Sequence, residues 1–333
     1  MNACVARVPS VLPPRVPPLS QPDSEPRVLD GAALVTRLDR GVIRVDGPDR
    51  ASWLQGLLTN DIAALAPGQG CYAAWLTPQG RMITDVVVLA EETSLSLEVP
   101  GSLAEDVYRR LDAAVFAEDV LLTDEGAVWA TIGVHGARAA EVVARALVGS
   151  RPSITLDAAT LTAWPEYAHA PLGHLGRVLR LDMYGVPGYA LRVESASRDL
   201  WMSRLRLAGA SFVPAGELEF ARIEAGRPEF LVDMDTDTIP LDAGIEGRAI
   251  SFTKGCYVGQ EVIVRVVHRG GGRVARRLVG LRLSGETVPI AHAPVTAGEK
   301  VVGEITSAAW SPVASAPVAL ALVHRDAVHP GTA

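Results

Sequence analysis

At residues 254–261 the chain reads KGCYVGQE, a stretch that sets a cysteine between two glycines and two residues after a lysine. Lysine is scarce in this sequence, because Lys254 and Lys300 are the only two among a majority of arginines. A thiol becomes reactive when its thiolate is stabilised and accessible, and Lys254 stands close enough in sequence to lower the pKa of the Cys256 thiol. The alternative is that Cys256 is a small buried hydrophobic residue in a turn.

The residues after this stretch fit two kinds of secondary structure. Glu261 and Arg265 stand four residues apart, the spacing at which opposite charges pair on a helix. The valines and the isoleucine of 262–267 are β-branched, which favours a strand instead. Gly255 and Gly259 carry no side chain, so a ligand or partner can approach the backbone on either side of the cysteine. The pattern alone leaves helix and strand open.

The composition limits the class of protein. Of the 333 residues, 48% are hydrophobic and 21% are charged, values typical of globular domains. The formal net charge of -7 argues against a general nucleic-acid-binding surface, and we expect no direct nucleic-acid partner. No apolar run approaches the ~20 residues that a transmembrane helix needs, so we expect no membrane association.

Cysteine and proline content bear on the compartment. The three cysteines, Cys4, Cys71 and Cys256, cannot form a closed set of disulfides and show no CxxC spacing, which indicates a reducing environment. They are also too few to supply the four thiolates of a self-contained iron–sulfur cluster. Residues 1–27 contain seven prolines, which disfavours a targeting helix. The sequence therefore predicts a cytoplasmic protein with a disordered leader.

Strand and helix patterns follow one another along the rest of the chain without a regular βαβ order. Residues 82–90 are a β-branched run typical of a strand, whereas 199–208 repeat apolar residues at helical spacing. From residue 273 onward short strand patterns dominate. We therefore predict an α+β protein. Its expected parts are a leader at 1–27, an N-terminal α+β module at 28–150, a second α+β module at 151–272 and a β-barrel module at 273–333.

Several stretches together resemble one protein family. The stretch 254–261 is similar to the signature of the YgfZ family, which includes mitochondrial relatives that act in iron–sulfur assembly. The wider YgfZ/GcvT folate-binding superfamily also contains the aminomethyltransferase of the glycine cleavage system. The resemblance extends over residues 28–326 and involves LQGLLTND at 54–61, TPQGR at 77–81, RIEAGRP at 222–228, HRG at 268–270 and GEITS at 303–307.

This resemblance implies a fold and a function. The fold would be a cloverleaf of three modules around a central folate cavity, with a C-terminal β-barrel. The function would be that of a folate-binding accessory protein for iron–sulfur cluster assembly or repair, linked to transfer-RNA modification only through its client enzymes. Its partners would be those clients or cluster-assembly proteins, and its cofactor would be tetrahydrofolate or another folate. We expect the chain to act as a monomer.

Site residues follow from the same resemblance. Cys256, Lys254 and Asp85 would be catalytic, Asp85 because it matches the catalytic aspartate of the aminomethyltransferases. Asn60 equally fits a capping turn at a helix end. The full set of expected folate-binding residues is Asn60, Asp85, Glu224, Tyr257, Gln260, Glu261 and Arg265.

Glu224 is the candidate for recognition of the pteridine ring. A carboxylate can accept two hydrogen bonds from the amide edge of such a ring, and arginines can clamp the carboxylates of a folate tail. Arg222 and Arg227 lie close to Glu224 in sequence, so a simple charge pair explains the glutamate equally well.

One position departs from the transferases. Where those enzymes carry a GFE-like stretch whose glutamate meets the pteridine, this chain has Gly188-Tyr189-Ala190, and the side chain of Ala190 accepts no hydrogen bond. The departure favours the accessory role. A tetrahydrofolate-dependent aminomethyl or one-carbon transferase that uses Asp85 is the alternative function, so enzyme status stays open. An interaction module that has lost ligand binding is a third hypothesis.

Overall fold

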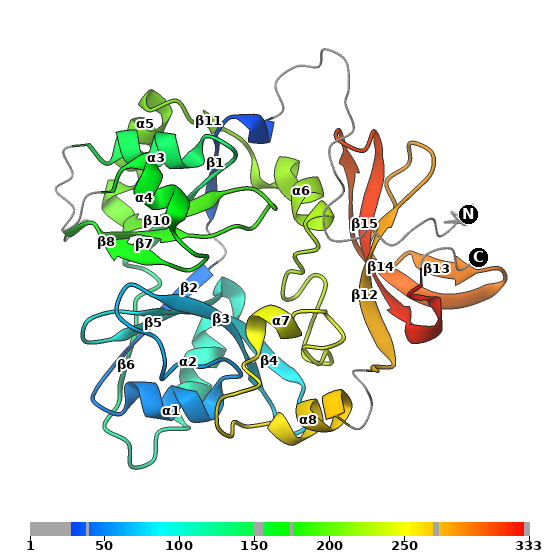
Figure 1. The fold of residues 1–333 in the computed structure, drawn as a ribbon, viewed down its shortest axis with the longest axis horizontal. Coiled ribbons are helices and arrows are strands. Elements are labelled where there is room, and N and C mark those ends of the chain that lie inside the picture. Colours follow the sequence, from blue (N-terminus) through cyan, green and yellow to red (C-terminus); the bar gives the residue numbers. More distant parts are fainter. Residues whose placement is uncertain (1–27, 38–39, 149–155, 174–175, 269–272, 330–333) are drawn as a thin grey trace.

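The computed structural model describes residues 28–37, 40–148, 156–173, 176–268 and 273–329. Its strands form three sheets, and Figure 1 shows them as three bodies with α6 (Glu219–Glu224) and α7 (Glu246–Ala249) between them. The predicted α+β fold is confirmed. The predicted leader at 1–27 and the residues 150–151 and 272 at the predicted module boundaries lie outside the described ranges.

A five-stranded antiparallel sheet, in the order β3-β4-β5-β2-β6, forms one body. Its elements are β2 (Arg40–Asp46), β3 (Gly70–Leu76), β4 (Met82–Ala90), β5 (Leu95–Pro100), β6 (Leu121–Asp124), α1 (Arg50–Leu57) and α2 (Ala104–Asp112). The run at 82–90 forms a strand as predicted. Successive side chains of a strand point to opposite faces, so Val86 and Val88 join the core with α1 and α2, while Asp85 and Val87 line a cavity.

A six-stranded sheet, in the order β11-β1-β7-β10-β9-β8, forms the second body. Its elements are β1 (Ala33–Arg37), β7 (Trp129–His135), β8 (His169–Pro171), β9 (Gly176–Arg180), β10 (Gly188–Glu194), β11 (Ser211–Phe212), α3 (Ala139–Ala146), α4 (Ala158–Ala163) and α5 (Arg198–Leu207). Because β1 and β7 belong here, the predicted module at 28–150 contributes strands to two sheets. Such pairing between distant segments leaves no local periodicity in the sequence.

The third body is a four-stranded antiparallel sheet, in the order β12-β15-β14-β13. Its strands are β12 (Arg276–Arg282), β13 (Pro294–Ala297), β14 (Lys300–Ser311) and β15 (Ala316–His324). The strand patterns predicted after residue 273 are therefore confirmed. Ile223 of α6 packs on Val318 and Leu320 of β15, which attaches this sheet to the rest of the molecule.

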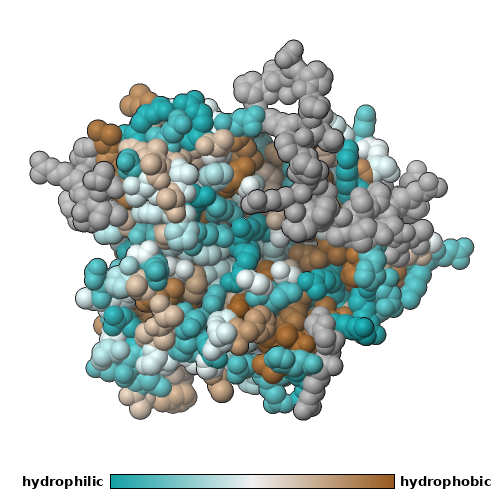
Figure 2. All heavy atoms as spheres, in the orientation of Figure 1, coloured by the Kyte–Doolittle hydropathy of each residue, from teal (hydrophilic) through white to brown (hydrophobic). Residues whose placement is uncertain are grey.

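The segment after Gly259 is a helix, α8 (Gln260–His268), and not a strand. Arg265 Nη2 donates to Glu261 Oε1 at 2.5 Å across one turn, and Ile263 is fully buried in a core shared by several elements. The helical penalty of β-branched residues is small, so burial of one helix face outweighs it. Hydrophilic residues cover much of the face in Figure 2, and hydrophobic residues gather near α8.

None of the helices in the described ranges is long and apolar enough to cross a membrane.

The junction of the two larger sheets contains a buried histidine, His169 of β8, which is 6% exposed. Its ring nitrogens contact Arg177 Nη1 at 2.9 Å and the Gln69 carbonyl oxygen at 3.2 Å. Burial, together with the charge of Arg177, lowers the pKa of His169 from 6.5 to about 3. Between these two pH values the unfolded chain binds a proton that the folded chain does not, so stability falls as the pH decreases.

We expect His169→Gln to reduce the acid sensitivity of folding. Loss of this one proton removes up to roughly 1.4 kcal/mol per pH unit from the slope of unfolding free energy against pH. Urea titrations between pH 6.5 and 3 measure that slope, with His292→Gln as the control because the side chain of His292 is 79% exposed. An unchanged slope in His169→Gln would contradict this prediction.

Candidate functional site

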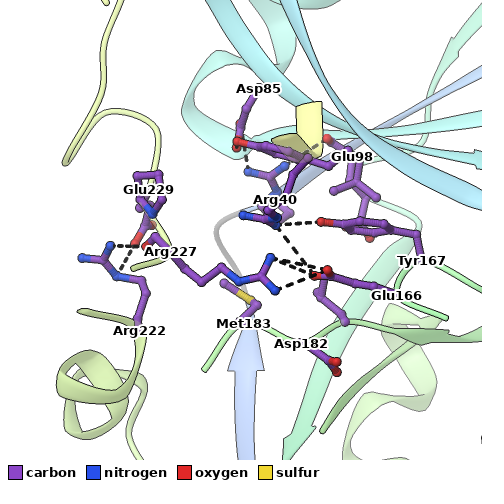
Figure 3. A pocket seen from close by; sticks show the side chains of 15 residues that line it. Arg40, Asp85, Glu98, Glu166, Tyr167, Asp182, Met183, Arg222, Arg227 and Glu229 are labelled. Atoms are coloured by element: carbon purple, nitrogen blue, oxygen red, sulfur yellow. Dashed lines mark hydrogen bonds and ion pairs between the residues drawn. The ribbon is translucent and has the colours of Figure 1, made fainter. Parts of the chain in front are cut away.

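A cavity lies where the two larger sheets meet the segments around α6 and α7. Figure 3 shows charged side chains from these separate elements converging on it. Its lining consists of Arg40, Tyr72, Asp85, Val87, Glu98, Glu166, Tyr167, Leu181, Asp182, Met183, Arg222, Arg227, Pro228, Glu229 and Arg248. Both signs of charge are present, so the cavity suits a ligand that carries hydrogen-bond donors as well as anionic groups.

Asp85 presents a buried carboxylate to this cavity. The residue is 7% exposed, and a buried carboxylate is tolerated only with partners. The Tyr72 hydroxyl donates to Oδ2 at 3.1 Å, and Arg40 Nη1 lies 3.5 Å from Oδ1. The carboxylate is thereby held in one position while it remains at the cavity wall.

Tyr72 of β3 is itself contacted by Arg248. Burial, and next the charge of Asp85, raise the pKa of Tyr72 well above its usual value, so the phenol stays protonated and acts as a donor. The guanidinium carbon of Arg248 lies 4.9 Å from the centre of the Tyr72 ring, a cation–π arrangement. Arg248 Nη2 also donates to the Tyr167 hydroxyl at 2.8 Å.

The two glycine-containing turns of the sequence pack against each other. Gly80, which has φ +76°, would place a Cβ 2.8 Å from Val262 Cβ in α8. Gly259, with φ +84°, would place a Cβ 2.5 Å from the Thr77 carbonyl oxygen. These glycines are required by close packing and by their backbone conformation. Gly259 therefore gives a ligand no open path to the backbone, contrary to our expectation.

Lys254 binds the end of α1 rather than Cys256. Its Nζ donates to the carbonyl oxygens of Gln55 at 2.6 Å, Leu58 at 2.6 Å and Asn60 at 2.9 Å. The last carbonyls of a helix have no partner within the helix, and a cation there also complements the helix dipole. Burial lowers the pKa of Lys254 to about 8. These contacts leave the predicted activation of the Cys256 thiol by Lys254 without a geometric basis.

We expect Lys254→Met to lower the free energy of unfolding by about 1–3 kcal/mol, because three carbonyls lose their donor. Urea denaturation measures the change, and Lys300→Met is a matched control since Lys300 is exposed. Equal stability of the two variants would show that the ammonium does not support α1.

Cys256 is exposed and lies outside the cavity lining. The catalytic role expected for Cys256 therefore has no support from a ligand cavity beside it. Tyr257 is buried in the core that contains Ile263, and Lys254 Nζ lies 5.2 Å from the centre of its ring. The segment around Cys256 is therefore held by the packing of Tyr257 in the core and by its contact with Lys254.

The other residues predicted to bind folate are dispersed. Asn60 Nδ2 donates to the carbonyl oxygens of Tyr72 at 2.8 Å and Arg248 at 3.0 Å, so it supports the site through their backbone. The Glu224 carboxylate accepts from Ser311 Oγ at 2.6 Å and thus binds the C-terminal sheet. Gln260, Glu261 and Arg265 lie on α8, outside the cavity lining. Of the predicted set, Asp85 alone lines the cavity.

Sequence reasoning missed Arg40 and Tyr72, which contact Asp85, and Arg248, which contacts Tyr72. Arg40, Tyr72 and Arg248 come from β2, β3 and α7, and none carries a local signal of function. Arg222 and Arg227 were noted only as possible charge partners of Glu224. In the structure both line the cavity and pair with other carboxylates.

Comparisons with known proteins agree on one family. The model of the GCVT N-terminal domain matches residues 28–254, and the model of the glycine cleavage T-protein C-terminal barrel domain matches residues 276–333. An aminomethyltransferase of Streptomyces avermitilis is 32% identical, covering 94% of this chain and 84% of that protein. One of Streptomyces coelicolor is 30% identical over 88% and 78%.

A solved structure supports the fold. The glycine cleavage system aminomethyltransferase T of Bartonella henselae superposes with a TM-score of 0.80, covering 92% of this chain and 81% of that chain at 20% identity. At 20% identity this similarity supports the fold only.

The interpretation as an iron–sulfur accessory protein is overturned by these relatives. It rested on the stretch 254–261, whereas the curated relatives that match nearly the whole chain are aminomethyltransferases. The structure gives a physical reason why that stretch misled us, since Lys254 and Gly259 serve helix capping and packing. With this correction the predicted iron–sulfur partners lose their support.

Proposed function

Since the chain belongs to the GCVT family, named for the glycine cleavage T-protein, we propose that it is a tetrahydrofolate-dependent aminomethyltransferase. The observation that carries this proposal is the buried carboxylate of Asp85, held by Tyr72 and Arg40 at the wall of a charged cavity. It is the alternative function that the sequence left open.

The cavity chemistry fits a reduced folate. Such a molecule has a pteridine ring with an amide edge, which carboxylates can accept, and a tail with carboxylates, which arginines can clamp. The lining supplies both kinds of group, with Arg40, Arg222, Arg227 and Arg248 beside the acidic residues.

Asp85 is positioned to accept and return a proton during one-carbon transfer. Tetrahydrofolate, when bound, supplies the amine nitrogens that receive the one-carbon unit. The transferred carbon forms bonds to two nitrogens, each of which loses a proton, while its bonds to the leaving amine and to the donor carrier break and each of these leaving groups gains a proton. The Asp85 carboxylate, oriented by Tyr72, accepts the first proton and can return it. Arg40 keeps the carboxylate in place through its contact with Oδ1.

The donor of the aminomethyl group is proposed to come from the other components of a glycine cleavage system. This follows from the family description and replaces the expected iron–sulfur partners.

A finer position inside the family is proposed from sequence alone. The stretch 254–261 resembles the YgfZ signature, and Ala190 stands where transferases carry a glutamate, so we place the chain on the YgfZ side by descent. This placement concerns ancestry and leaves the proposed activity unchanged. Ala190→Glu is expected to lower stability, because Ala190 is 2% exposed in the core and a carboxylate there would be buried without a partner.

The proposed activity has a direct test. Purified protein is incubated with tetrahydrofolate and an aminomethyl donor prepared with the remaining components of a glycine cleavage system, and methylene-tetrahydrofolate is measured by mass spectrometry. We expect product above the level without protein. Calorimetric titration with tetrahydrofolate also tests the hypothesis of an interaction module that has lost ligand binding, because saturable binding excludes that hypothesis. No binding and no product would overturn the proposal.

A further inference from the structure

Strand β3 is the edge of the five-stranded sheet, and the segment 58–60 lies along its outer side. An edge strand leaves a row of amides and carbonyls without a partner strand. Thr59 supplies the partners of Ala74, since its amide donates to the Ala74 carbonyl oxygen at 3.0 Å and its hydroxyl accepts from the Ala74 amide at 2.8 Å. Asn60 Nδ2 donates to the Tyr72 carbonyl oxygen at 2.8 Å. The segment therefore takes the place of a further strand beside β3.

The same two side chains bind the end of α7. This helix ends at Ala249, and the last carbonyls of a helix have no partner within the helix. Thr59 Oγ1 donates to the Ala249 carbonyl oxygen at 2.6 Å, and Asn60 Nδ2 donates to the Arg248 carbonyl oxygen at 3.0 Å. The Ser251 amide donates to the Thr59 carbonyl oxygen at 3.1 Å. Thr59 and Asn60 thus join β3 to α7.

The side chains of Thr59 and Asn60 have no hydrogen left to donate to a ligand. Thr59 is fully buried, and its hydroxyl gives its one hydrogen to Ala249. Asn60 uses both hydrogens of its amide on backbone carbonyls. Both residues lie outside the cavity lining. Any effect on chemistry in the cavity must therefore pass through the backbone that they hold.

That backbone carries two cavity side chains that contact each other. The guanidinium carbon of Arg248 lies 4.9 Å from the centre of the Tyr72 ring, and the Tyr72 hydroxyl donates to Asp85 Oδ2 at 3.1 Å. Ala74, the residue that Thr59 holds, lies directly opposite Asp85 in the pairing of β3 with β4. The bonds of Thr59 and Asn60 therefore fix both the strand beside Asp85 and the position of Arg248 on the phenol.

We propose that Thr59 and Asn60 are positioning residues for proton transfer at Asp85. They hold α7 at a fixed separation from β3, so that Arg248 packs on the Tyr72 ring and the phenol hydroxyl points at the carboxylate. The inference rests on the proposed function. A purely structural bridge would instead lower stability and leave the rate of the folded protein unchanged.

The test measures kcat and KM for tetrahydrofolate with the full chain, at a temperature at which each variant is folded. Thr59→Val keeps the shape but removes the hydroxyl. We expect kcat to fall roughly 10- to 100-fold, the worth of a hydrogen bond to a charged group, with little change in KM. Thr59→Ser returns the hydroxyl and should restore most of the rate. Combined with Tyr72→Phe, Thr59→Val should add no further loss, because both changes act on the bond between Tyr72 and Asp85.

Gln55→Leu is the matched control, because it weakens the same turn without removing a bond to β3 or α7. The Gln55 side chain accepts from the Ile62 amide at 2.7 Å and donates to Asp61 Oδ1 at 2.9 Å. This variant should be less stable in urea than the native protein and should keep the native kcat.

The outcomes separate this inference from the function on which it rests. No product from the native protein would overturn both. Product from the native protein with a native kcat in Thr59→Val, or the same loss of rate with and without the Tyr72 hydroxyl, would overturn the positioning role and leave the proposed function standing. If Thr59→Val does not fold, Asn60→Ser replaces it. Serine donates one hydrogen where asparagine donates two, so kcat should still fall, and a native kcat would contradict the inference.

Discussion

Replacing Asp85 by asparagine is expected to lower the rate of one-carbon transfer to tetrahydrofolate by roughly 10²–10⁴-fold, the usual contribution of a positioned general base. An amide has nearly the shape of the carboxylate but cannot take up a proton near neutral pH. The contact with the Tyr72 hydroxyl at 3.1 Å can be kept by the amide oxygen. We therefore expect the fold and the affinity for tetrahydrofolate to change little, so the loss should appear in kcat rather than in KM.

Tyr72→Phe adds a graded comparison to Asp85→Asn. It removes one hydrogen bond to the carboxylate while leaving the ring that Arg248 contacts, so a smaller loss is expected, together with a shifted pH–rate profile. Single-turnover rates with saturating tetrahydrofolate measure both variants. Asp237→Asn serves as control, because the side chain of Asp237 is 80% exposed. A rate for Asp85→Asn within a factor of two of the native rate would remove Asp85 from the mechanism.

Asp85 was identified through the resemblance to the aminomethyltransferases, whereas local signals predicted only the strand that carries it. A glycine turn at 77–80 is followed by a β-branched run, and alternation along that strand places every second side chain on one face. The same local reasoning located the C-terminal strands. It could not locate Arg40, Tyr72 and Arg248, because Arg40 and Tyr72 meet Asp85, and Arg248 meets Tyr72, only after β2, β3 and α7 have assembled.

The scarcity of lysine led us to expect a chemical role for Lys254, whereas the structure gives it a structural role. Lys254 is indeed no surface filler, but its three carbonyl partners at the end of α1 show that it is constrained by packing. A rare residue in a motif thus indicates a structural requirement before it indicates chemistry. The atoms that the residue contacts in the folded chain decide between a structural and a chemical role. For Lys254 these contacts include the Gln55 carbonyl oxygen, about two hundred positions away along the chain.

Asp233 connects the cavity wall to the C-terminal sheet. Its oxygens accept from Arg222 Nη1 at 2.5 Å, from Thr306 Oγ1 at 2.5 Å, from Ser307 Oγ at 2.6 Å and from the Glu229 amide at 3.0 Å. The Asp233 side chain is fully buried and that of Arg222 is 2% exposed. One carboxylate therefore holds α6, which lines the cavity through Arg222, against β14.

We expect Asp233→Ala to destabilise the protein by about 3–5 kcal/mol, the cost of leaving a buried charge without its partner. Arg222 would retain only Glu219 and the Arg227 carbonyl oxygen as close partners among those described, and the hydroxyls of Thr306 and Ser307 would lose an acceptor. Removing Asp233 also frees Arg222 to leave the cavity wall, so tetrahydrofolate affinity should fall together with stability. Urea denaturation and calorimetry measure the two effects.

Asp237→Ala is the control in the same loop, because its exposed pair with Arg81 is worth about 0–1 kcal/mol. Ser307→Ala and the double variant complete a cycle. If Asp233 bridges the two elements, the losses of the single variants will exceed that of the double variant when summed, since both remove the same contact. Strictly additive losses would mean that Asp233 and Ser307 do not share a contact. A change below about 1 kcal/mol for Asp233→Ala would mean that α6 is attached to the sheet mainly by the apolar contacts of Ile223 and the hydrogen bond between Glu224 and Ser311.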